Sequence, residues 1–343
     1  MRYKLLGKSG LRVSELCLGA MTFGEAWHLG ASSETSRQVF DLFGQAGGNF
    51  VDTANNYQDG QSETILGELI KANRDYWVVA TKYTATATDQ TDPNKGGNSR
   101  KTLHQKVEGS LRRLQTDYID VLYVHVWDFI TPIEEVMRGL DDVIRAGKVR
   151  YIAISDTPAW IVAEANARAE LRGWSQFIGF QLPYSLIDRD IERAEIPLAK
   201  HWDMALLPFG ALAGGLLSGK YASGEAGRLG QPKLDERKQR ILDEVLRMAT
   251  EIGTSPAQVA LNWVRQQQDR AVIVPIIGAR NAAQLADNLG CLDWSLSPDQ
   301  MQRLDAVSRI DYGFTRDGIE GDLRQYVFGK TFDLTDNHRG YPR

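Results

Sequence analysis

The sequence is poor in cysteine, with only Cys17 and Cys291 among its 343 residues. Two thiols in a chain of this length cannot form the disulfide framework of a small secreted domain, so we expect a reducing compartment. The amino-terminal residues contain no apolar signal region, and no apolar run approaches the roughly 18 residues that span a bilayer. The sequence therefore predicts a cytoplasmic protein without a membrane-spanning segment.

A surplus of charge of one sign is also missing. The formal net charge is −4, from 40 Lys and Arg residues and 44 Asp and Glu residues. The sequence thus lacks the basic surface that binds nucleic acid or an anionic membrane. Its histidines and cysteines do not have the spacing of a zinc site, so we expect no metal.

Common nucleotide-binding motifs are absent or incomplete. No Gly-x-Gly occurs, so the fingerprint of the Rossmann dinucleotide fold is missing. The segment Gly214–Lys220 matches most of a Walker A loop, but Tyr221 follows it where Ser or Thr would bind magnesium. We therefore expect no nucleoside triphosphatase, although the glycines of this segment can still present backbone amides to a pyrophosphate.

What the sequence does contain is a regular alternation of short apolar runs and longer amphipathic stretches. This alternation is typical of βα units and a parallel sheet. The apolar runs predict strands at Leu16–Leu18, Phe50–Val51, Trp77–Ala80, Ile119–Val124, Val149–Ile154, Phe177–Phe180, Ala205–Leu207 and Val272–Val274. The amphipathic stretches predict helices that include Ser36–Gly44, Ser62–Lys71, Thr102–Leu114, Ile133–Ala146 and Pro158–Ala169.

Eight predicted strands favour a closed barrel over an open sheet. The predicted fold class is therefore α/β, a (β/α)8 TIM barrel that forms a single domain over residues 1–343. Such a barrel takes about 250 residues. The excess fits an N-terminal β-hairpin (Arg2–Leu6 and Arg12–Glu15), a long segment at Leu212–Lys233, and a C-terminal tail at Asp311–Arg343. We expect the tail to lie over the active-site face.

Four prolines predict the starts of helices. Thr131, Thr157, Ser255 and Ser297 each precede a proline, so each can cap a helix whose first residue is that proline. Glu134, three residues after Thr131, completes the pattern of a capping box.

Polar residues mark the ends of three neighbouring strands. Asp52 ends the second predicted strand and Tyr57 lies in the loop after it, while Lys82 ends the third strand and His125 the fourth. The carboxyl ends of barrel strands build the active site, so these four side chains are expected on one rim. Taken singly, each residue has a structural explanation. Asp52 could cap a turn, and Tyr57 could pack on its neighbours in the loop. Lys82 could reach solvent, and His125 could be a hydrogen-bonded histidine under a loop.

Together, the four side chains form a set that suits carbonyl reduction. A carbonyl oxygen must receive a proton as hydride arrives at its carbon. A free phenol has a pKa near 10, and a nearby ammonium group lowers that pKa. A carboxylate beside Lys82 holds the ammonium charged and in place, and an imidazole can orient the substrate oxygen.

At these residues the sequence resembles the aldo-keto reductase family. Asp52, Tyr57, Lys82 and His125 match the family tetrad in order and approximate spacing, and the resemblance extends from Leu16 to the region of Asn288. The motifs that carry the resemblance are Asp52–Tyr57, Gly147–Ile152 and Leu212–Tyr221. The stretch Ile154–Trp160 is most similar to the branch that contains aryl-alcohol dehydrogenases and related bacterial reductases.

The resemblance implies a role for each member of the tetrad. Tyr57 is the general acid in reduction and the base in oxidation, Lys82 tunes it, and Asp52 holds Lys82. His125 orients the carbonyl. Hydride passes from carbon 4 of the nicotinamide, and no metal takes part.

The resemblance also implies an NADP(H) site and a site for a small-molecule carbonyl substrate. The residues at cofactor-binding positions are Gly19, Ala20, Met21, Asp52, Ser155, Asp156, Gln181, Phe209, Gly210, Ala211, Leu212, Ala213, Gly214, Lys220, Gly278, Arg280, Gln284, Asp287 and Asn288. The residues expected to contact substrate are Trp27, His28, Tyr57, His125 and Trp127. Of these, Trp27, His28 and Trp127 are chosen because they follow the first and fourth predicted strands, where substrate would enter, and packing at the rim explains them equally well.

The sequence departs from the family pattern at three places in the cofactor site. Asp156 stands where Asn is usual, which removes a hydrogen-bond donor but keeps an acceptor for the carboxamide. Gly210 and Ala211 replace the commoner Ser-Pro after the stacking aromatic residue. Ala279 replaces a hydroxyl found in some relatives, so phosphate recognition rests more on the guanidinium of Arg280, which favours NADP over NAD.

Two other functions remain open from the sequence. Channel β-subunits resemble the same family, so the chain could be a cofactor-binding regulatory subunit with little catalysis. A barrel lyase or isomerase that uses Lys82 as a Schiff-base amine is a third reading. The sequence leaves the physiological substrate, the direction of reaction and the oligomeric state undetermined.

Overall fold

A computed structural model provides the structure of the protein and describes residues 1–221 and 234–336. The second half of the segment predicted at Leu212–Lys233 and the last seven residues of the tail lie outside the described residues.

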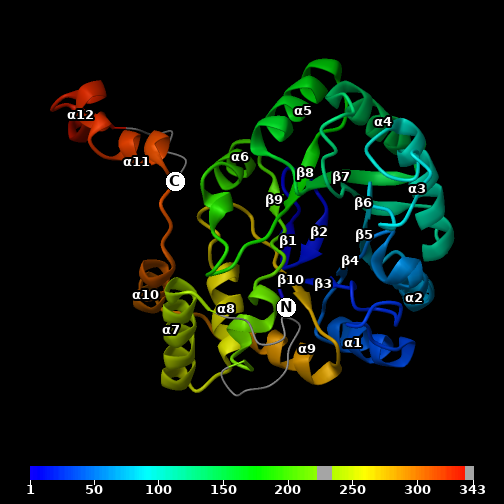
Figure 1. Cartoon of the computed structure of the whole chain (residues 1–343), viewed down its shortest axis with the longest axis horizontal. Coiled ribbons are helices and arrows are strands. Elements are labelled where there is room, and N and C mark those ends of the chain that lie inside the picture. Colours follow the sequence, from blue (N-terminus) through cyan, green and yellow to red (C-terminus); the bar gives the residue numbers. More distant parts are fainter. Residues whose placement is uncertain (222–233, 337–343) are drawn as a thin grey trace.

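The centre of the molecule is a parallel sheet that curls into a barrel (Figure 1). In the described residues it has eight strands, in the order β10-β3-β4-β5-β6-β7-β8-β9, and every pair of neighbours is parallel. The strands are β3 (Cys17–Gly19), β4 (Phe50–Asp52), β5 (Val78–Tyr83), β6 (Ile119–Val124), β7 (Val149–Ser155), β8 (Phe177–Gln181), β9 (Ala205–Leu206) and β10 (Ile276–Gly278). The predicted (β/α)8 barrel is confirmed.

The predicted eighth strand is wrong in position. The run Val272–Val274 is not assigned as a strand, and the strand β10 follows it after Pro275. Both stretches form hydrogen bonds where the barrel closes. Leu206 donates its N–H to the carbonyl of Val272 at 2.7 Å, and Val274 donates to Leu206 at 2.9 Å, while β10 pairs with β3. The pairing with the β9 side continues past Pro275, since Ile276 donates to the carbonyl of Pro208 at 2.8 Å, and the carbonyl of Pro275 accepts from the N–H of Cys17 at 2.9 Å.

The helices surround the barrel in Figure 1. The α-helices are α1 (Ser33–Gln45), α2 (Gln61–Ile70), α3 (Arg100–Leu114), α4 (Ile133–Arg145), α5 (Ala159–Arg172), α6 (Glu195–His201), α7 (Glu236–Ile252), α8 (Pro256–Arg265), α9 (Ala282–Leu289), α10 (Pro298–Ser308), α11 (Phe314–Glu320) and α12 (Leu323–Phe328). The 3-10 helices are η1 (Tyr57–Gly60), η2 (Lys71–Asn73), η3 (Asp190–Glu192), η4 (Ala213–Ser218), η5 (Gly290–Leu292) and η6 (Phe332–Leu334).

Two of the four predicted helix caps are confirmed. Ser255 caps α8 by accepting from the N–H of Gln258 at 3.2 Å. Ser297 caps α10 by accepting from the N–H of Gln300, whose side chain accepts in turn from the N–H of Ser297 at 2.8 Å. The second cap is a complete capping box.

The other two predicted caps are wrong, because both threonine hydroxyls bond elsewhere. Thr131 donates to the carboxylate of Asp128 at 2.6 Å, and Thr157 donates to the carbonyl of Ser155 at 2.7 Å. The proline after each threonine takes the N-cap position of α4 and α5 instead. Glu134 consequently forms no capping box with Thr131.

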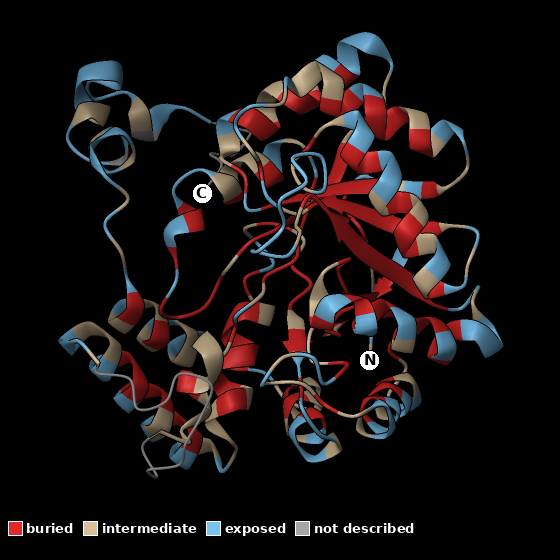
Figure 2. Cartoon of the chain, turned by 45° about the vertical axis from the view of Figure 1, so that its right-hand side comes forward, coloured by how far each residue is buried: buried red, intermediate tan, exposed pale blue. Residues whose placement is uncertain are grey.

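The N-terminal hairpin is confirmed and closes one end of the barrel. Strands β1 (Tyr3–Leu5) and β2 (Arg12–Ser14) pair antiparallel. Leu6 and Val13 of this hairpin belong to the same buried cluster as the inward side chains Phe50 and Val121 of the barrel. A second, larger cluster lies between the strands and the helices, and Figure 2 shows the sheet as the most buried part of the molecule. No helix in the described residues is long and apolar enough to cross a membrane.

The C-terminal tail does not take the predicted position over the active-site face. Helices α11 and α12 extend away from the strands of the barrel in both views (Figures 1 and 2). The tail is bonded to the rest of the molecule near its start, where Tyr312 donates to the carboxylate of Glu192 at 2.6 Å and Arg316 of α11 donates to the carbonyl of Glu192.

Candidate active site

Strand geometry places the predicted tetrad in the top layer of the barrel. Side chains alternate along a strand, so a residue two positions after an inward side chain also points inward. Phe50 is part of the cluster inside the barrel, and Asp52 follows it on β4. Ala80 precedes Lys82 on β5 in the same way, and Tyr123 precedes His125 at the end of β6. The structure therefore brings Asp52, Lys82 and His125 to one end of the barrel.

The ammonium group of Lys82 is the centre of this cluster. Lys82 is fully buried, and its Nζ donates to Asp52 Oδ1 at 2.5 Å and to the carbonyl oxygen of Thr53 at 2.8 Å. Its third donor reaches the hydroxyl of Tyr57 at 3.2 Å. Burying a charge is costly unless it is paired and hydrogen-bonded, and this arrangement satisfies all three donors of the ammonium.

A turn with left-handed backbone presents Tyr57 to Lys82. After Tyr57, the residues Gln58 and Asp59 have φ angles of 50° and 56°, and Gly60 has 90°. Such angles are strained for residues other than glycine, and strain of this kind concentrates at functional sites. The ring of Tyr57 also lies edge-on to the ring of His125, with 5.8 Å between centroids.

Gln58 is a residue of this site that the sequence did not reveal. Its side chain is buried, and its Nε2 donates to the carbonyl of Met21 at 3.1 Å while its Oε1 accepts from the N–H of Trp27 at 2.7 Å. Gln58 thus joins the loop after β3 to the turn that carries Tyr57. In the sequence, the one feature that could have pointed to Gln58 is its position next to Tyr57.

Burial and charge act in opposite directions on the two proton-bearing groups. Burial raises the pKa of Tyr57 above 10.0, and this effect outweighs the opposing charge of Lys82. Burial lowers the pKa of Lys82, but the attractions of Asp52 and Tyr57 outweigh it, so the pKa of Lys82 rises. The sequence argument expected Lys82 to lower the pKa of the phenol. The net shift is upward, so at neutral pH the site holds a protonated phenol beside a charged ammonium.

His125 is neutral over the physiological range. Burial, helped by the charge of Lys82, lowers the pKa of His125 from 6.5 to about 3. Its buried Nδ1 has no hydrogen-bond partner within the described residues. A neutral imidazole carries one N–H donor, so His125 can orient a carbonyl oxygen but cannot supply a proton as an imidazolium.

We expect the ring signals of His125 in an NMR titration to stay constant between pH 8 and pH 5. The unfolded chain binds a proton at this position near pH 6.5, whereas the folded chain does so only near pH 3. The contribution of His125 to stability is therefore complete above pH 6.5 and is lost as the pH falls toward 3, by about 1.4 kcal/mol per pH unit. A spectrum of His125→Asn identifies the signals, and a midpoint near pH 6.5 would contradict this account.

Several residues predicted to bind the cofactor surround the tetrad. Ser155 at the end of β7 is in register with Gln181 at the end of β8. The Nε2 of Gln181 donates to Asp52 Oδ2 at 2.9 Å, so this side chain also supports the tetrad. Asp156 follows with a φ of 38°, a left-handed conformation that Asp tolerates better than most residues.

The loop after β3 and the strand β10 lie against the same rim. Gly19 is in register with Gly278 on one side and with Asp52 on the other. The N–H of Ala20 donates to the carbonyl of Asp52 at 2.8 Å. Asn288 donates to the carbonyl of Gly278 at 3.3 Å, which joins α9 to this rim.

The segment after β9 has a left-handed backbone over three successive residues. Phe209 donates its N–H to the carbonyl of Leu182 at 3.0 Å, which fixes the start of the segment beside the end of β8. Ala213, Gly214 and Gly215 then have successive positive φ angles of 47°, 67° and 93°. Left-handed turns can turn backbone amides toward an anion, but here the N–H groups of Ala213 and Gly215 donate to the carbonyls of Gly210 and Leu212 at 2.7 and 2.9 Å. Lys220 lies within this same segment, with its ammonium 5.2 Å from the ring centre of Tyr221.

The first turn of α9 offers a cation and a helix N-terminus side by side. Arg280 is exposed, and no ion pair or hydrogen bond within the described residues involves its guanidinium. Its backbone N–H donates to Gln284 Oε1 at 2.9 Å, and Asn281 caps the helix. Asp287, by contrast, accepts from Gln258 at 2.9 Å and is thus already engaged by a neighbouring helix. This arrangement suits a phosphate group.

Comparison with known proteins identifies the chain. The Aldo/keto reductase family profile matches residues 15–309. This chain belongs to the aldo/keto reductase family. It is 40% identical over 330 residues to the aryl-alcohol dehydrogenase (NADP(+)) of Phanerodontia chrysosporium, which covers 89% of this chain and 85% of the relative. It is 39% identical over 319 residues to the norsolorinic acid reductase of Aspergillus flavus, which covers 90% and 81%.

The resemblance read from the sequence motifs is confirmed by these matches. A further relative, an aryl-alcohol dehydrogenase of Pestalotiopsis microspora, is 40% identical over 91% of this chain and 84% of its own length. These three relatives are fungal. As a member of this family, the chain is an oxidoreductase that interconverts carbonyl compounds and alcohols.

The predicted substrate contacts of the reductase differ in their surroundings. The ring of Trp27 lies 6.1 Å from the ring of Tyr57, with the two planes at 72°, and its Nε1 donates to Asp59 at 3.3 Å. His28 is exposed next to it. Trp127 is buried in the larger core cluster, so its ring packs against the protein interior. The structure thus brings Trp27 to the tetrad, whereas Trp127 and His28 remain predictions.

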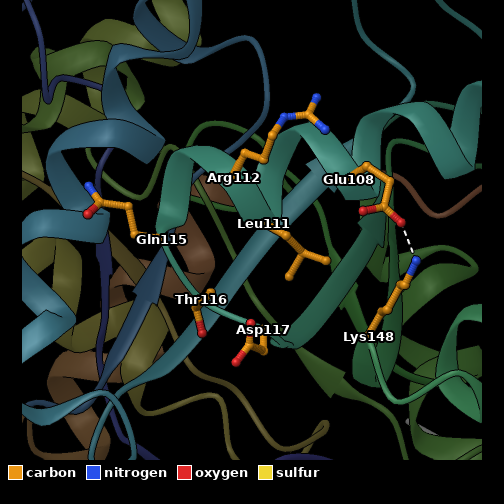
Figure 3. A pocket seen from close by; sticks show the side chains of 7 residues that line it. All are labelled: Glu108, Leu111, Arg112, Gln115, Thr116, Asp117 and Lys148. Atoms are coloured by element: carbon orange, nitrogen blue, oxygen red, sulfur yellow. Dashed lines mark hydrogen bonds and ion pairs between the residues drawn. The ribbon is translucent and has the colours of Figure 1, made fainter.

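The described residues of the reductase form no metal site, and a surface pocket lies away from the tetrad. No group of three or more His, Cys, Asp or Glu side chains in the described residues is arranged to hold a metal ion. A surface pocket of about 450 Å3 lies along α3 and contains the ion pair of Glu108 and Lys148 (Figure 3). Thr116 and Asp117 of this pocket precede β6, and Lys148 precedes β7. The pocket therefore lies at the amino ends of the strands, away from the tetrad.

Proposed function

We propose that this reductase reduces aromatic aldehydes or ketones to alcohols with NADPH, reversibly, and that Tyr57 is the general acid. The observation that carries the proposal is the hydroxyl of Tyr57 at 3.2 Å from the buried ammonium of Lys82. The phenol is protonated at neutral pH, because burial raises its pKa. It is thus ready to donate to a carbonyl oxygen.

Each residue of the tetrad acts either on the carbonyl group or on another residue of the tetrad. The chemistry that bound NADPH supplies is transfer of a hydride to the carbonyl carbon. Tyr57 gives its hydroxyl proton to the carbonyl oxygen, and Lys82 stabilises the phenolate that remains. Asp52 keeps Lys82 charged through their 2.5 Å contact. Neutral His125 donates its N–H to the same oxygen and orients it.

The cofactor is NADP(H), and Arg280 binds the phosphate that distinguishes it from NAD(H). The exposed guanidinium beside the N-terminus of α9 supports this assignment. The left-handed segment at Ala213–Gly215 suits the pyrophosphate, and Ser155 with Gln181 suits the carboxamide. The aryl-alcohol dehydrogenase relative carries NADP(+) in its name.

Removing the guanidinium of Arg280 tests the cofactor assignment. We expect Arg280→Ala to raise the dissociation constant for NADPH by about 10- to 100-fold, because a hydrogen bond to a charged group contributes about 1.5–3 kcal/mol. The dissociation constant for NADH stays nearly unchanged. Quenching of tryptophan fluorescence measures both. Arg12→Ala, another exposed arginine on the distant hairpin, is the control; equal losses for both nucleotides would reject a phosphate contact.

Aromatic substrates are proposed from the ring of Trp27 beside Tyr57 and from the names of the relatives. Benzaldehyde and cyclohexanecarbaldehyde have nearly the same size, so they separate aromatic recognition from simple burial. We expect Trp27→Ala to raise KM for benzaldehyde by about 5-fold more than for cyclohexanecarbaldehyde, since an aromatic pair contributes about 1 kcal/mol beyond burial. Equal effects on both aldehydes would remove Trp27 from substrate recognition.

The two other readings of the sequence are less well supported. The named relatives are dehydrogenases and reductases, which does not favour a regulatory subunit with little catalysis. A Schiff-base amine must lose its proton, and the raised pKa of Lys82 opposes that. We also propose a cytoplasmic location, which the two buried, unpaired cysteines support.

A further inference from the structure

The tail carries a set of apolar side chains that nothing covers within the described residues. We name residues 314–334 the arm. Phe314, Tyr326 and Leu334 have 80%, 87% and 81% of their surface exposed. In total, the exposed large apolar side chains of the arm are Phe314, Ile319, Tyr326, Val327, Phe328 and Leu334. So many large apolar side chains exposed within one short segment are typical of an interaction site.

The arm leaves the barrel from a fixed root. The hydroxyl of Tyr312 donates to Glu192 at 2.6 Å, and Arg193 donates to the carbonyl of Asp311 at 2.8 Å. Glu192 is itself buried and forms ion pairs with Arg189 at 2.8 Å and Arg270 at 3.0 Å. The arm itself contacts this network, because Arg316 of α11 donates to the carbonyl of Glu192. Beyond this contact, Figure 1 shows α11 and α12 extending away from the strands of the barrel.

The arm also has internal structure of its own. α11 and α12 pack on each other, and the rings of Phe328 and Phe332 meet with 5.2 Å between centroids. The guanidinium of Arg324 lies 4.2 Å from the centre of the Phe332 ring. The arm is therefore a folded helical hairpin with an uncovered apolar surface.

A second group of exposed apolar side chains follows the carboxyl ends of two neighbouring strands. We name Val126, Phe129, Ile130 and Trp160 the rim patch. These exposed side chains come from the segments after the neighbouring strands β6 and β7, and Ile130 has 85% of its surface exposed. The arm of the same chain does not lie on this patch.

The loop of the rim patch is held in one conformation. The carboxylate of Asp128 accepts from the N–H groups of Ile130 at 3.0 Å and of Asn98 at 2.8 Å. The side chain of Asn98 accepts in return from the N–H of Asp128 at 2.7 Å. A surface that is already ordered loses little entropy when it binds a partner.

We propose that the arm of one copy packs on the rim patch of a second copy, so that two chains form a twofold-symmetric dimer. Each chain carries both surfaces, so one symmetric pair covers two arms and two rim patches. An aromatic side chain buries about 150–250 Å2. At the exposures given, the arm presents on the order of 800 Å2, which is what one partner contributes to a stable interface.

The oligomeric state tests the proposal independently of catalysis. We expect light scattering on the full chain to give the mass of a dimer over a concentration series. Replacing Tyr326 and Val327 with Ser raises the dimer dissociation constant by about 100-fold or more, because a few central anchors carry most of the energy of an interface. Leu171→Ser is the matched control, since Leu171 on α5 is 86% exposed and lies outside both surfaces. A monomeric wild type, or a double variant that dimerises normally, would overturn the proposal.

Disulfide trapping tests the position of the arm. The native cysteines are both buried, so they do not compete with new surface thiols. Val327→Cys mixed with Phe129→Cys should give a disulfide-linked pair that contains one copy of each variant. Val327→Cys mixed with Leu171→Cys should give none. A dimer in which Val327→Cys links to the control position as readily as to Phe129→Cys would show that the arm does not lie on the rim patch.

Discussion

Tyr57→Phe is expected to lower kcat for aldehyde reduction by about 10³-fold, because the general acid is lost while the rest of the site stays in place. The phenol is the one proton donor that lies between Lys82 and the ring of His125 in the arrangement described above. Affinity for NADPH stays close to that of the wild type, since the hydroxyl donates to the substrate. Steady-state kinetics and fluorescence quenching measure the two quantities separately.

A second tyrosine on β5 supplies the matched control. Tyr83 is buried, and its hydroxyl has no hydrogen-bond partner within the described residues. Tyr83→Phe removes the same atom one residue away from Lys82 and should leave kcat unchanged. If Tyr57→Phe kept most of its turnover, or if both variants lost it equally, Tyr57 would not be the acid.

Lys82→Met is expected both to abolish turnover and to destabilise the fold. Removing one partner of a buried ion pair costs about 3–5 kcal/mol, because the other charge remains buried without compensation. Here the remaining charge is the carboxylate of Asp52, which accepts from Lys82 at 2.5 Å and from Gln181 at 2.9 Å. Chemical denaturation measures the loss in the free energy of unfolding.

The double variant Lys82→Met with Asp52→Asn separates stability from catalysis. Neutralising Asp52 removes the uncompensated charge, so the double variant should regain most of the lost stability and none of the turnover. A double-mutant cycle gives the coupling energy directly. Full additivity of the two single losses would mean that the two side chains do not act as a pair in the folded protein.

The strands and the tetrad could be predicted from the sequence because two local signals agree there. Apolar residues identify each strand. A polar residue two positions after the last inward-pointing apolar residue identifies the end of the strand that faces the active site. Asp52, Lys82 and His125 all follow this rule. For the eighth strand, the apolar residues alone did not give the right position. The apolar run Val272–Val274 continues beyond Pro275 into Ile276–Gly278, and no local pattern tells which of these two stretches pairs with β3.

The remaining errors depend on the tertiary structure. Thr131 and Thr157 have the sequence of helix caps, but each hydroxyl finds a partner in its own loop. The sign of the shift in the pKa of Tyr57 depends on how deeply the fold buries the phenol. The contact at the start of the tail joins Tyr312 to Glu192 across 120 residues of chain. None of these distances is encoded in a local pattern.

The proposed roles also account for proton transfer in both directions. In the proposal, a protonated Tyr57 serves reduction, and the phenolate that remains is the base for oxidation of the alcohol. The ammonium of Lys82 would stabilise that phenolate, because the net effect of its neighbours keeps Lys82 charged.

The most direct test of the account follows a labelled hydride through one turnover. The reductase is incubated with an aromatic aldehyde and NADPH that carries deuterium at both positions of carbon 4 of the nicotinamide, and the product is analysed by mass spectrometry. The account predicts an alcohol with one deuterium on the carbinol carbon for the wild type, and almost no product for Tyr57→Phe. An alcohol without deuterium, or no alcohol from any aldehyde tested, would contradict it.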